Sequence, residues 1–370
     1  MNYKRMPIEI ESPEEMGYDT IQYNLAESSI RDRTLGNFKL DLNNTVLAYT
    51  EHRGITPLRE AIITESDTLS PDNVLVTTGA AMALFLISTT LLDKDDHIIV
   101  IRPNYATNLE TPRAIGCKMT ILDLDFDNKF ALNTEGVQKA ITSKTKLISI
   151  TNPHNPTGIL FDSNTINDLI KIAEAHNCYL LIDETYRELN FQTTLNPYVA
   201  ERSNKVISVS SLSKAYGVPG IRTGWLISQD ADLMHKLLAA KEQMILGNSV
   251  LDEAVALHIL QHKSTLLPPI HAQIRANFAI FQKWFAEQLY LEWVEPQAGV
   301  VCFPRLIKGF KLDFIPFQKA LYEDYKTVVG FGHWFEQPET YFRIGFGFPT
   351  EGELQQGLDR FEECLRRYNY

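Results

Sequence analysis

A lysine that directly follows a Ser-x-Ser segment and precedes a glycine-rich turn and an arginine is the most reactive pattern in this chain. The segment contains Ser211, Ser213, Lys214 and Arg222 in that order. A lysine amine condenses with an aldehyde where its surroundings keep part of the amine neutral. Arg222 stays charged at any working pH and suits a phosphate group, to which both serine hydroxyls can also donate. An amine for an aldehyde beside a phosphate clamp indicates pyridoxal phosphate, whereas a lone lysine of this kind is usually a solvated loop residue.

Two side chains near residue 183 suit a flat nitrogen-containing ring. Asp183 ends the apolar segment 179–182, and a carboxylate there can pair with a ring nitrogen and keep it protonated. Tyr186, three residues later, can bond a phenolic oxygen of the ring. A helix cap or a metal site is the alternative for the pair Asp183 and Glu184. We expect no metal, because no histidine or carboxylate cluster in the sequence complements this pair.

Two more candidates for contacts with the ring also follow apolar segments. Asn155 lies in the loop 151–158, which two prolines and a glycine hold rigid, so its amide can donate to the phenolic oxygen. Tyr105 follows the short apolar segment 97–101, and an aromatic side chain at a strand end can stack on a flat ring. Ordinary packing is the alternative for Tyr105.

Two features indicate binding of anions. Gly79 precedes the start of an apolar helix, whose first backbone N–H groups are free to bind an anion. Ala80 and Ala81 follow it and offer backbone donors only, and a glycine in this position is also common in simple turns. Arg343 lies in a short apolar strand, where a charge must be paired or face a cleft. Its guanidinium matches a carboxylate of a ligand, or else an internal partner such as Glu339.

The order of the predicted elements indicates an α/β fold. Strand-like segments near residues 74, 97, 147, 179, 205 and 222 are mostly separated by helical segments. This order predicts a predominantly parallel sheet with helices on both faces. The candidate groups follow strand ends, so we expect them to gather at one edge of the sheet. A strand over 296–303 is expected to enter a second, smaller α+β domain.

Composition sets wider limits. The 370 residues exceed one ordinary core, and a hydrophobic content of 44% is enough for two domains. The net charge of -11 argues against a nucleic-acid partner. No apolar segment is long enough to span a membrane, and the charged N-terminus lacks a signal core. Four scattered cysteines without metal-ligand spacing favour a reducing cytoplasm.

The lysine segment, with the pattern Ser-x-Ser-Lys-x-x-Gly-x-x-Gly-x-Arg-x-Gly, resembles the cofactor-lysine signature of class I/II aminotransferases. The loop pattern Asn-Pro-x-Asn-Pro-Thr-Gly resembles a second signature of that family. The resemblance implies fold type I, pyridoxal 5'-phosphate as cofactor, and a mostly parallel sheet of the seven-stranded type. It also implies an N-terminal arm over 1–40 that joins the small domain, a large cofactor-binding domain over 41–260, and a small α+β domain over 261–370.

The resemblance further implies roles for the candidates. Lys214 would carry the cofactor as a Schiff base and move protons, with Asp183 and Tyr186 as its catalytic partners. Arg343 would hold the α-carboxylate of the substrate, with Asn155 beside it. The phosphate would be bound by the residues that surround it in the family, which correspond here to Gly79, Ala80, Ala81, Ser211, Ser213 and Arg222.

Two more assignments rest on the N-terminal part of the chain. A segment similar to 20–29 runs past the substrate pocket in the family, which makes Ala26 and Glu27 candidate substrate contacts. A solvated surface carboxylate is the alternative for Glu27. The pattern Tyr-x4-Gly-x3-Leu-Arg places Tyr49 where the family tyrosine reaches the phosphate in the neighbouring subunit. It implies a homodimer with shared sites, and a tyrosine packed under a loop is the alternative.

The implied reaction is transfer of an amino group between an L-amino acid and a 2-oxo acid. Relatives on this fold also catalyse eliminations, cyclisations and oxidations, so a lyase, a cyclase or an oxidase is the alternative. The segments 24–29 and 345–347 have a faint similarity to capreomycidine-synthase-like members, which act on arginine derivatives. Together with Glu27, this similarity suggests a cationic side chain on the substrate. A non-catalytic regulator is disfavoured, because the sequence has no spare DNA-binding segment.

Overall fold

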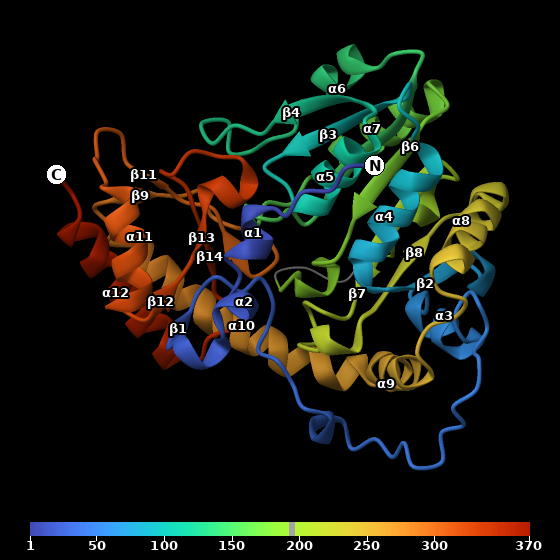
Figure 1. The fold of residues 1–370 in the computed structure, drawn as a ribbon, viewed down its shortest axis with the longest axis horizontal. Coiled ribbons are helices and arrows are strands. Elements are labelled where there is room, and N and C mark those ends of the chain that lie inside the picture. The colour runs from blue at the N-terminus through green and yellow to red at the C-terminus, as the bar shows by residue number, and fades with distance from the viewer. Residues whose placement is uncertain (192–196) are drawn as a thin grey trace.

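A seven-stranded sheet lies at the centre of the computed structural model, which describes residues 1–191 and 197–370 (Figure 1). Its strands are β2 (Val74–Thr78), β3 (His97–Arg102), β4 (Lys118–Asp123), β5 (Thr145–Thr151), β6 (Tyr179–Asp183), β7 (Val206–Ser211) and β8 (Thr223–Ile227). The strand order is β2-β8-β7-β6-β5-β3-β4. All neighbouring strands are parallel except the two pairs that involve β8. The prediction of a predominantly parallel sheet between helices is confirmed.

Helices cover both faces of this sheet. Those of the sheet region are α3 (Thr56–Ile62), α4 (Gly79–Leu91), α5 (Ala106–Ile115), α6 (Thr134–Ala140), α7 (Ser163–Ala175), α8 (Ala231–Met244) and α9 (Val250–Gln261). Successive strand residues belong to two different apolar clusters. Leu75, Ile98 and Leu147 pack in the cluster of α4 and α8, whereas Ile99 and Ile148 belong to the cluster that contains α7 and α9. Burial on both faces explains the nearly continuous apolar strands.

The second part of the molecule combines both ends of the chain. It contains α1 (Pro7–Ile10), α2 (Pro13–Met16), α10 (Lys263–Ala286), α11 (Phe314–Glu323) and α12 (Glu351–Arg367). Its strands are β1 (Tyr23–Asn24), β9 (Leu291–Glu292), β10 (Val301–Cys302), β11 (Arg305–Leu306), β12 (Thr327–Val328), β13 (Gly330–Phe331) and β14 (Phe342–Gly345). β1 pairs in parallel with β12, which joins the N-terminal segment to the C-terminal half. The domain boundaries at residues 40 and 260 stay a prediction.

Two expectations about strands need correction. The strand expected over 296–303 is only Val301–Cys302, because the backbone N–H groups of Gln297 and Ala298 both donate to the carbonyl of Gly158 instead of to a sheet. The sequence analysis also missed β4, an edge strand whose partly exposed residues interrupt the apolar pattern. Edge strands need less apolar surface than central ones, so this pattern was weak.

The part of the chain that the structure describes holds no helix long and apolar enough to cross a membrane. Within the same residues, no group of three His, Cys, Asp or Glu side chains is arranged to hold a metal ion.

Candidate active site

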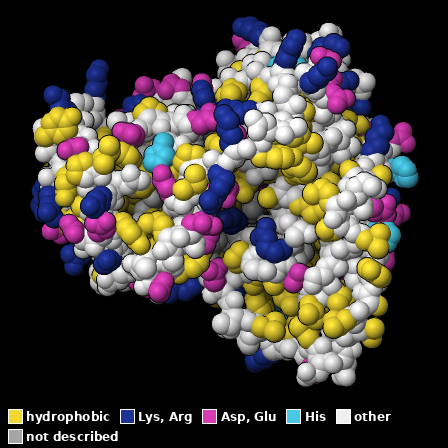
Figure 2. All heavy atoms as spheres, viewed as in Figure 1, with side chains coloured by type: hydrophobic (Ala, Val, Ile, Leu, Met, Phe, Trp, Pro, Cys, Tyr) yellow, Lys and Arg dark blue, Asp and Glu magenta, His cyan; other side chains and the backbone are white. Residues whose placement is uncertain are grey.

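A cavity of about 380 Å³ lies where the ends of the sheet strands meet the N-terminal segment and β14. Figure 2 shows a hollow between the two parts of the molecule with charged side chains around it. Nearly all the predicted site residues line this cavity, namely Ala26, Glu27, Ala80, Ala81, Tyr105, Asn155, Asp183, Tyr186, Ser211, Ser213, Lys214, Arg222 and Arg343. Gly79 packs against the guanidinium of Arg222, which itself lines the cavity. Tyr49 is exposed and does not line the cavity. The topology therefore gathers groups that are up to 317 residues apart in sequence.

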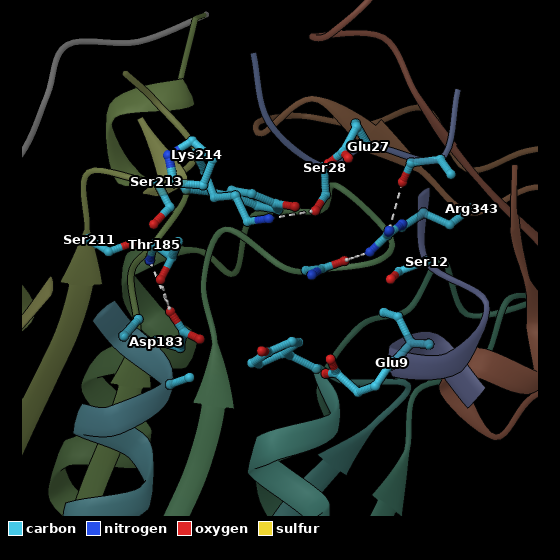
Figure 3. A pocket seen from close by; sticks show the side chains of 18 of the residues that line it. Glu9, Ser12, Glu27, Ser28, Asp183, Thr185, Ser211, Ser213, Lys214 and Arg343 are labelled. Carbon is cyan, nitrogen blue, oxygen red and sulfur yellow. Dashed lines mark hydrogen bonds between the residues drawn. The ribbon is translucent and has the colours of Figure 1, made fainter. Parts of the chain in front are cut away.

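Lys214 follows the end of β7 and extends into the cavity (Figure 3). Its Nζ donates to the hydroxyl of Ser28 at 3.1 Å. Burial lowers the pKa of Lys214, and Arg343 acts in the same direction, whereas Glu27 opposes them. A lowered pKa increases the neutral fraction of the amine, and the neutral amine is the form that attacks an aldehyde.

Asp183 ends β6 and is 5% exposed. The backbone N–H and the hydroxyl of Thr185 donate to its Oδ1 at 3.0 and 2.6 Å. Burial raises the pKa of Asp183, although these two hydrogen bonds and Lys214 oppose the shift. A cationic N–H group placed in the cavity would compensate for this burial, because it would favour the charged carboxylate.

The hydroxyl of Tyr186 is buried and lies near Ser28, but it makes no hydrogen bond of standard geometry to any described residue. Burial raises the pKa of Tyr186 to about 12. A buried hydroxyl without a partner is uncommon in folded proteins. This one therefore indicates room for a ligand atom that can accept or donate a hydrogen bond.

Arg343 lies in β14 and is 5% exposed. Its Nη2 donates to the carbonyl of Ala26 at 2.7 Å and its Nη1 donates to Oδ1 of Asn155 at 3.3 Å, while its Nε has no partner among the described residues. The ion pairs of the described chain do not include Arg343, so the alternative partner Glu339, which is exposed, does not neutralise it. A buried guanidinium without a carboxylate partner favours binding of an anionic group from a ligand.

The opposite end of the cavity forms a cradle for a small anion. Gly79 begins α4 with a φ of 77°. A Cβ atom on Gly79 would lie 2.6 Å from Nη2 of Arg222, so only glycine lets the guanidinium approach the helix N-terminus this closely. No side chain caps α4, which leaves its first N–H groups available near Ala80 and Ala81.

The chemistry of these groups fits pyridoxal phosphate. The cradle at α4 suits the phosphate, Asp183 suits a ring nitrogen, and the unpartnered Tyr186 hydroxyl suits a phenolic oxygen. Tyr105 lines the same cavity at the N-cap of α5, where its ring can cover a flat ligand. The loop that carries Asn155 is held by His154, whose two ring nitrogens contact Thr157 at 2.7 Å and the carbonyl of Pro103 at 3.0 Å.

Several cavity residues were missed by the sequence analysis. Ser28 bonds Lys214, and Thr185 bonds Asp183; both are adjacent to predicted residues, and this proximity was the signal that could have found them. Trp334 lines the cavity close to Arg343, with its ring centroid 5.9 Å from the guanidinium carbon. Glu9 and Glu14, on the short helices α1 and α2, also line the cavity, and no sequence motif marks them.

Tyr49 does not reach this cavity. It is 87% exposed, and the neighbouring Val46 and Leu47 are also largely exposed. The later part of the segment between β1 and α3 extends away from the rest of the chain in Figure 1. Large exposed apolar side chains on an extended segment are typical of an interaction surface.

Comparisons with known proteins agree with this geometry. The family model for aminotransferase class I and II matches residues 22–361. An aspartate aminotransferase from Thermotoga maritima is 29% identical over 328 residues, which cover 86% of this chain and 83% of that protein. Capreomycidine synthase from Streptomyces vinaceus is 29% identical over 300 residues, or 80% of this chain and 75% of that enzyme. The structure of a PLP-dependent aminotransferase from Streptococcus suis has a TM-score of 0.90 at 26% identity, with all of both chains covered. With a family match across nearly its whole length, this chain belongs to the class I and II aminotransferases and is an enzyme of that family.

Proposed function

We propose that the enzyme transfers an amino group between an L-amino acid and a 2-oxo acid, with pyridoxal 5'-phosphate bound at Lys214. The observation that carries this proposal is the pair formed by Lys214 and Arg343 in one cavity. The first is a half-buried amine with a lowered pKa, and the second is a buried guanidinium without a carboxylate partner. An amino acid offers one group for each of them, because its α-carboxylate suits Arg343 while its amine meets the centre at Lys214.

The cofactor would be held at its three polar ends. Arg222, the serine hydroxyls at 211 and 213 and the N-terminus of α4 would bind its phosphate. Asp183 would pair with its ring nitrogen, and Tyr186 with Asn155 would bond its phenolic oxygen. When bound, the protonated ring supplies an electron sink for the bonds at the substrate α-carbon.

The side chains of the chain itself would direct the proton transfers. Lys214, once displaced by the substrate amine, would be a neutral base beside the α-carbon, and it would move a proton from the α-carbon to the cofactor carbon two bonds away. Arg343 would fix the carboxylate and so set which bond of the α-carbon faces Lys214. Trp334 and the helices α1 and α2 cover this end of the cavity and would limit access of water.

We infer further that the enzyme is a homodimer of the reducing cytoplasm with shared sites. Tyr49, exposed in one chain, would reach the phosphate of the partner's cofactor. Isologous two-fold contacts are the commonest way for identical chains to associate. All four cysteines are buried and free, which agrees with a reducing compartment. Neither nucleic acid nor membrane is proposed as a partner.

A cyclase, lyase or oxidase reaction is the second candidate. The observation that favours it is the 29% identity with capreomycidine synthase, which equals the identity with the Thermotoga aspartate aminotransferase. Such reactions would use the same Lys214 and Asp183, so the cavity geometry fits both outcomes.

The test is anaerobic absorbance spectroscopy of the cofactor-loaded enzyme with single amino acids, together with identification of the products. Transfer predicts that the cofactor passes into its amine form with one equivalent of 2-oxo acid, and that a second 2-oxo acid reverses the change. Release of ammonia, or a cyclised product with the cofactor returned to its starting form, would replace the proposal by the second candidate. A Lys214→Ala variant is expected to lose turnover in either case.

A further inference from the structure

Three carboxylates line the cavity wall near Arg343. Glu9 comes from α1, Glu14 from α2, and Glu27 from the segment that follows β1. Figure 3 shows Glu9 and Glu27 at the side of the cavity where Arg343 lies, across from Lys214 and Asp183. None of the three forms an ion pair with a described lysine, arginine or histidine.

The other charged side chains of the cavity each have a binding partner in the proposed function. In the proposed function, Arg222 would bind the phosphate, Asp183 would pair with the ring nitrogen, and Arg343 would bind the α-carboxylate. Lys214 is used by the cofactor. No further lysine or arginine is among the described residues that line the cavity. Glu27 is half-buried while Glu9 and Glu14 are exposed, so these carboxylates would attract a cationic group of the substrate and repel an anionic one.

The nearest cation outside the cavity does not neutralise this wall. The guanidinium of Arg5 donates to the backbone carbonyl of Glu9 at 2.9 Å and pairs with Glu15 at 3.5 Å. Burial raises the pKa of Glu9, and its neighbour Glu14 adds to the shift, whereas Arg5 and Lys214 oppose it. The carboxylates thus repel one another, and a cation placed between them would relieve that repulsion.

Glu27 is held in position by its surroundings. The side chain of Asn24 accepts hydrogen bonds from the backbone N–H groups of Ala26 and Glu27 at 3.1 and 3.2 Å. The hydroxyl of Tyr18 donates to Oε1 of Glu27 at 3.1 Å. The carbonyl of Ala26 accepts from Arg343, so one short segment fixes both the guanidinium and the carboxylate. Such preorganisation is typical of a binding determinant rather than of a solvated carboxylate.

We propose that the amino donor is an L-amino acid with a cationic side chain, whose positive group is bound by Glu27 with Glu9 and Glu14 at the cavity mouth. The proposal rests on the proposed function, because Arg343 and Lys214 fix the other two ends of the substrate. The unpartnered Nε of Arg343, buried in the same cavity, independently indicates a ligand there. Aspartate would place a fourth carboxylate against this wall, so the name of the Thermotoga relative does not extend to this chain.

The experiment compares arginine with citrulline, which has nearly the same shape and no charge, on the cofactor-loaded enzyme. Stopped-flow absorbance gives the dissociation constant and the rate for each amino acid, with ornithine as the ammonium analogue and aspartate as the anionic one. We expect arginine or ornithine to bind at least about tenfold more tightly than citrulline and aspartate. Whichever of arginine and ornithine binds more tightly then shows whether the site prefers a guanidinium or an ammonium group.

A pair of variants tests the assignment to Glu27. Glu27→Gln should reduce the preference for arginine over citrulline to within about threefold. Glu15→Gln is the matched control, because Glu15 lies on α2 but pairs with Arg5 and does not line the cavity. It should retain the wild-type preference.

The outcomes separate the two proposals. Equal affinity for arginine and citrulline, or tighter binding of aspartate, would overturn the substrate class even if a 2-oxo acid is formed and amino transfer stands. Selective binding of arginine without formation of its 2-oxo acid would support the substrate class and contradict the transfer reaction. A preference that survives in Glu27→Gln would refute the role of this carboxylate.

Discussion

Replacement of Gly79 by alanine tests the phosphate cradle most directly. The residue has a φ of 77°, and its Cβ would lie 2.6 Å from Nη2 and 3.2 Å from Cζ of Arg222. Both distances lie below ordinary contact, so the guanidinium must move away from the start of α4. We expect Gly79→Ala to weaken cofactor binding through this displacement rather than through a loss of fold.

The substitution should have two separate free-energy costs. A left-handed alanine costs about 1–2 kcal/mol, a strain present with and without cofactor, so it lowers stability and leaves the affinity unaffected. Loss of a charge-assisted hydrogen bond from Arg222 to the phosphate costs about 1.5–3 kcal/mol. This second cost appears in the affinity, which should fall by about 10- to 150-fold.

The assay is titration of cofactor-free enzyme with pyridoxal phosphate, followed by protein fluorescence, beside denaturant unfolding of the same cofactor-free samples. Gly220→Ala is the matched control, since Gly220 lies in the turn before Arg222 and a Cβ there has no neighbour within 4 Å. We expect this control to change the affinity by less than twofold.

A double variant shows whether the effect passes through the guanidinium. If Gly79→Ala acts by displacing Arg222, it should lower the affinity little further in an Arg222→Ala background. Full additivity of the two changes, or a cofactor affinity of Gly79→Ala within twofold of wild type, would refute this account of the cradle.

Three further predictions concern the ring, the substrate and the loop. Asp183→Asn should retain the cofactor but lower kcat by about 10²- to 10⁴-fold, because a neutral amide does not hold the ring nitrogen protonated; steady-state kinetics at saturating cofactor measure this, and an unchanged kcat would contradict it. Arg343→Gln should raise the dissociation constant of the amino acid by about 10- to 150-fold with cofactor affinity unchanged, as checked by stopped-flow titration. Burial lowers the pKa of His154 to about 3, below its unfolded value of about 6.5, so the unfolded chain binds more protons and stability is lost as pH falls through this window. Relative to His154→Gln, wild-type unfolding free energy should therefore fall by up to about 1.4 kcal/mol per pH unit below pH 6, and parallel curves in denaturant unfolding would exclude this contribution.

The catalytic end of the cavity was predictable because the sheet does most of the positioning. Asp183 ends β6, Lys214 closely follows β7, and Asn155 follows β5. These strands are parallel neighbours, so residues that follow them must meet at one edge whatever the details of packing. Order along the chain was therefore sufficient to predict that these three residues converge.

The substrate end was only partly predictable. Glu9 and Glu14 reach the cavity because α1 docks against the 3-10 turn Gly332–Phe335, where Glu11 accepts hydrogen bonds from Trp334 and His333 at 2.6 and 2.8 Å. These partners are more than 300 residues apart. Four-residue helices carry almost no periodic pattern, so the sequence of this region did not predict either the helices or their docking site.

The segment from Leu25 to Ser28 links the two parts of the molecule through the site itself. Its carbonyl groups at Leu25 and Ala26 accept from Gly345 and Arg343 on β14, while the hydroxyl of Ser28 accepts from Lys214 beside the sheet. A substrate that joins Lys214 to Arg343 therefore spans the same two elements that this segment already connects. Under the proposed roles of Arg343 and Glu27, affinity for the α-carboxylate and selection by Glu27 should be coupled, because a shift of β14 relative to the sheet would move both side chains together.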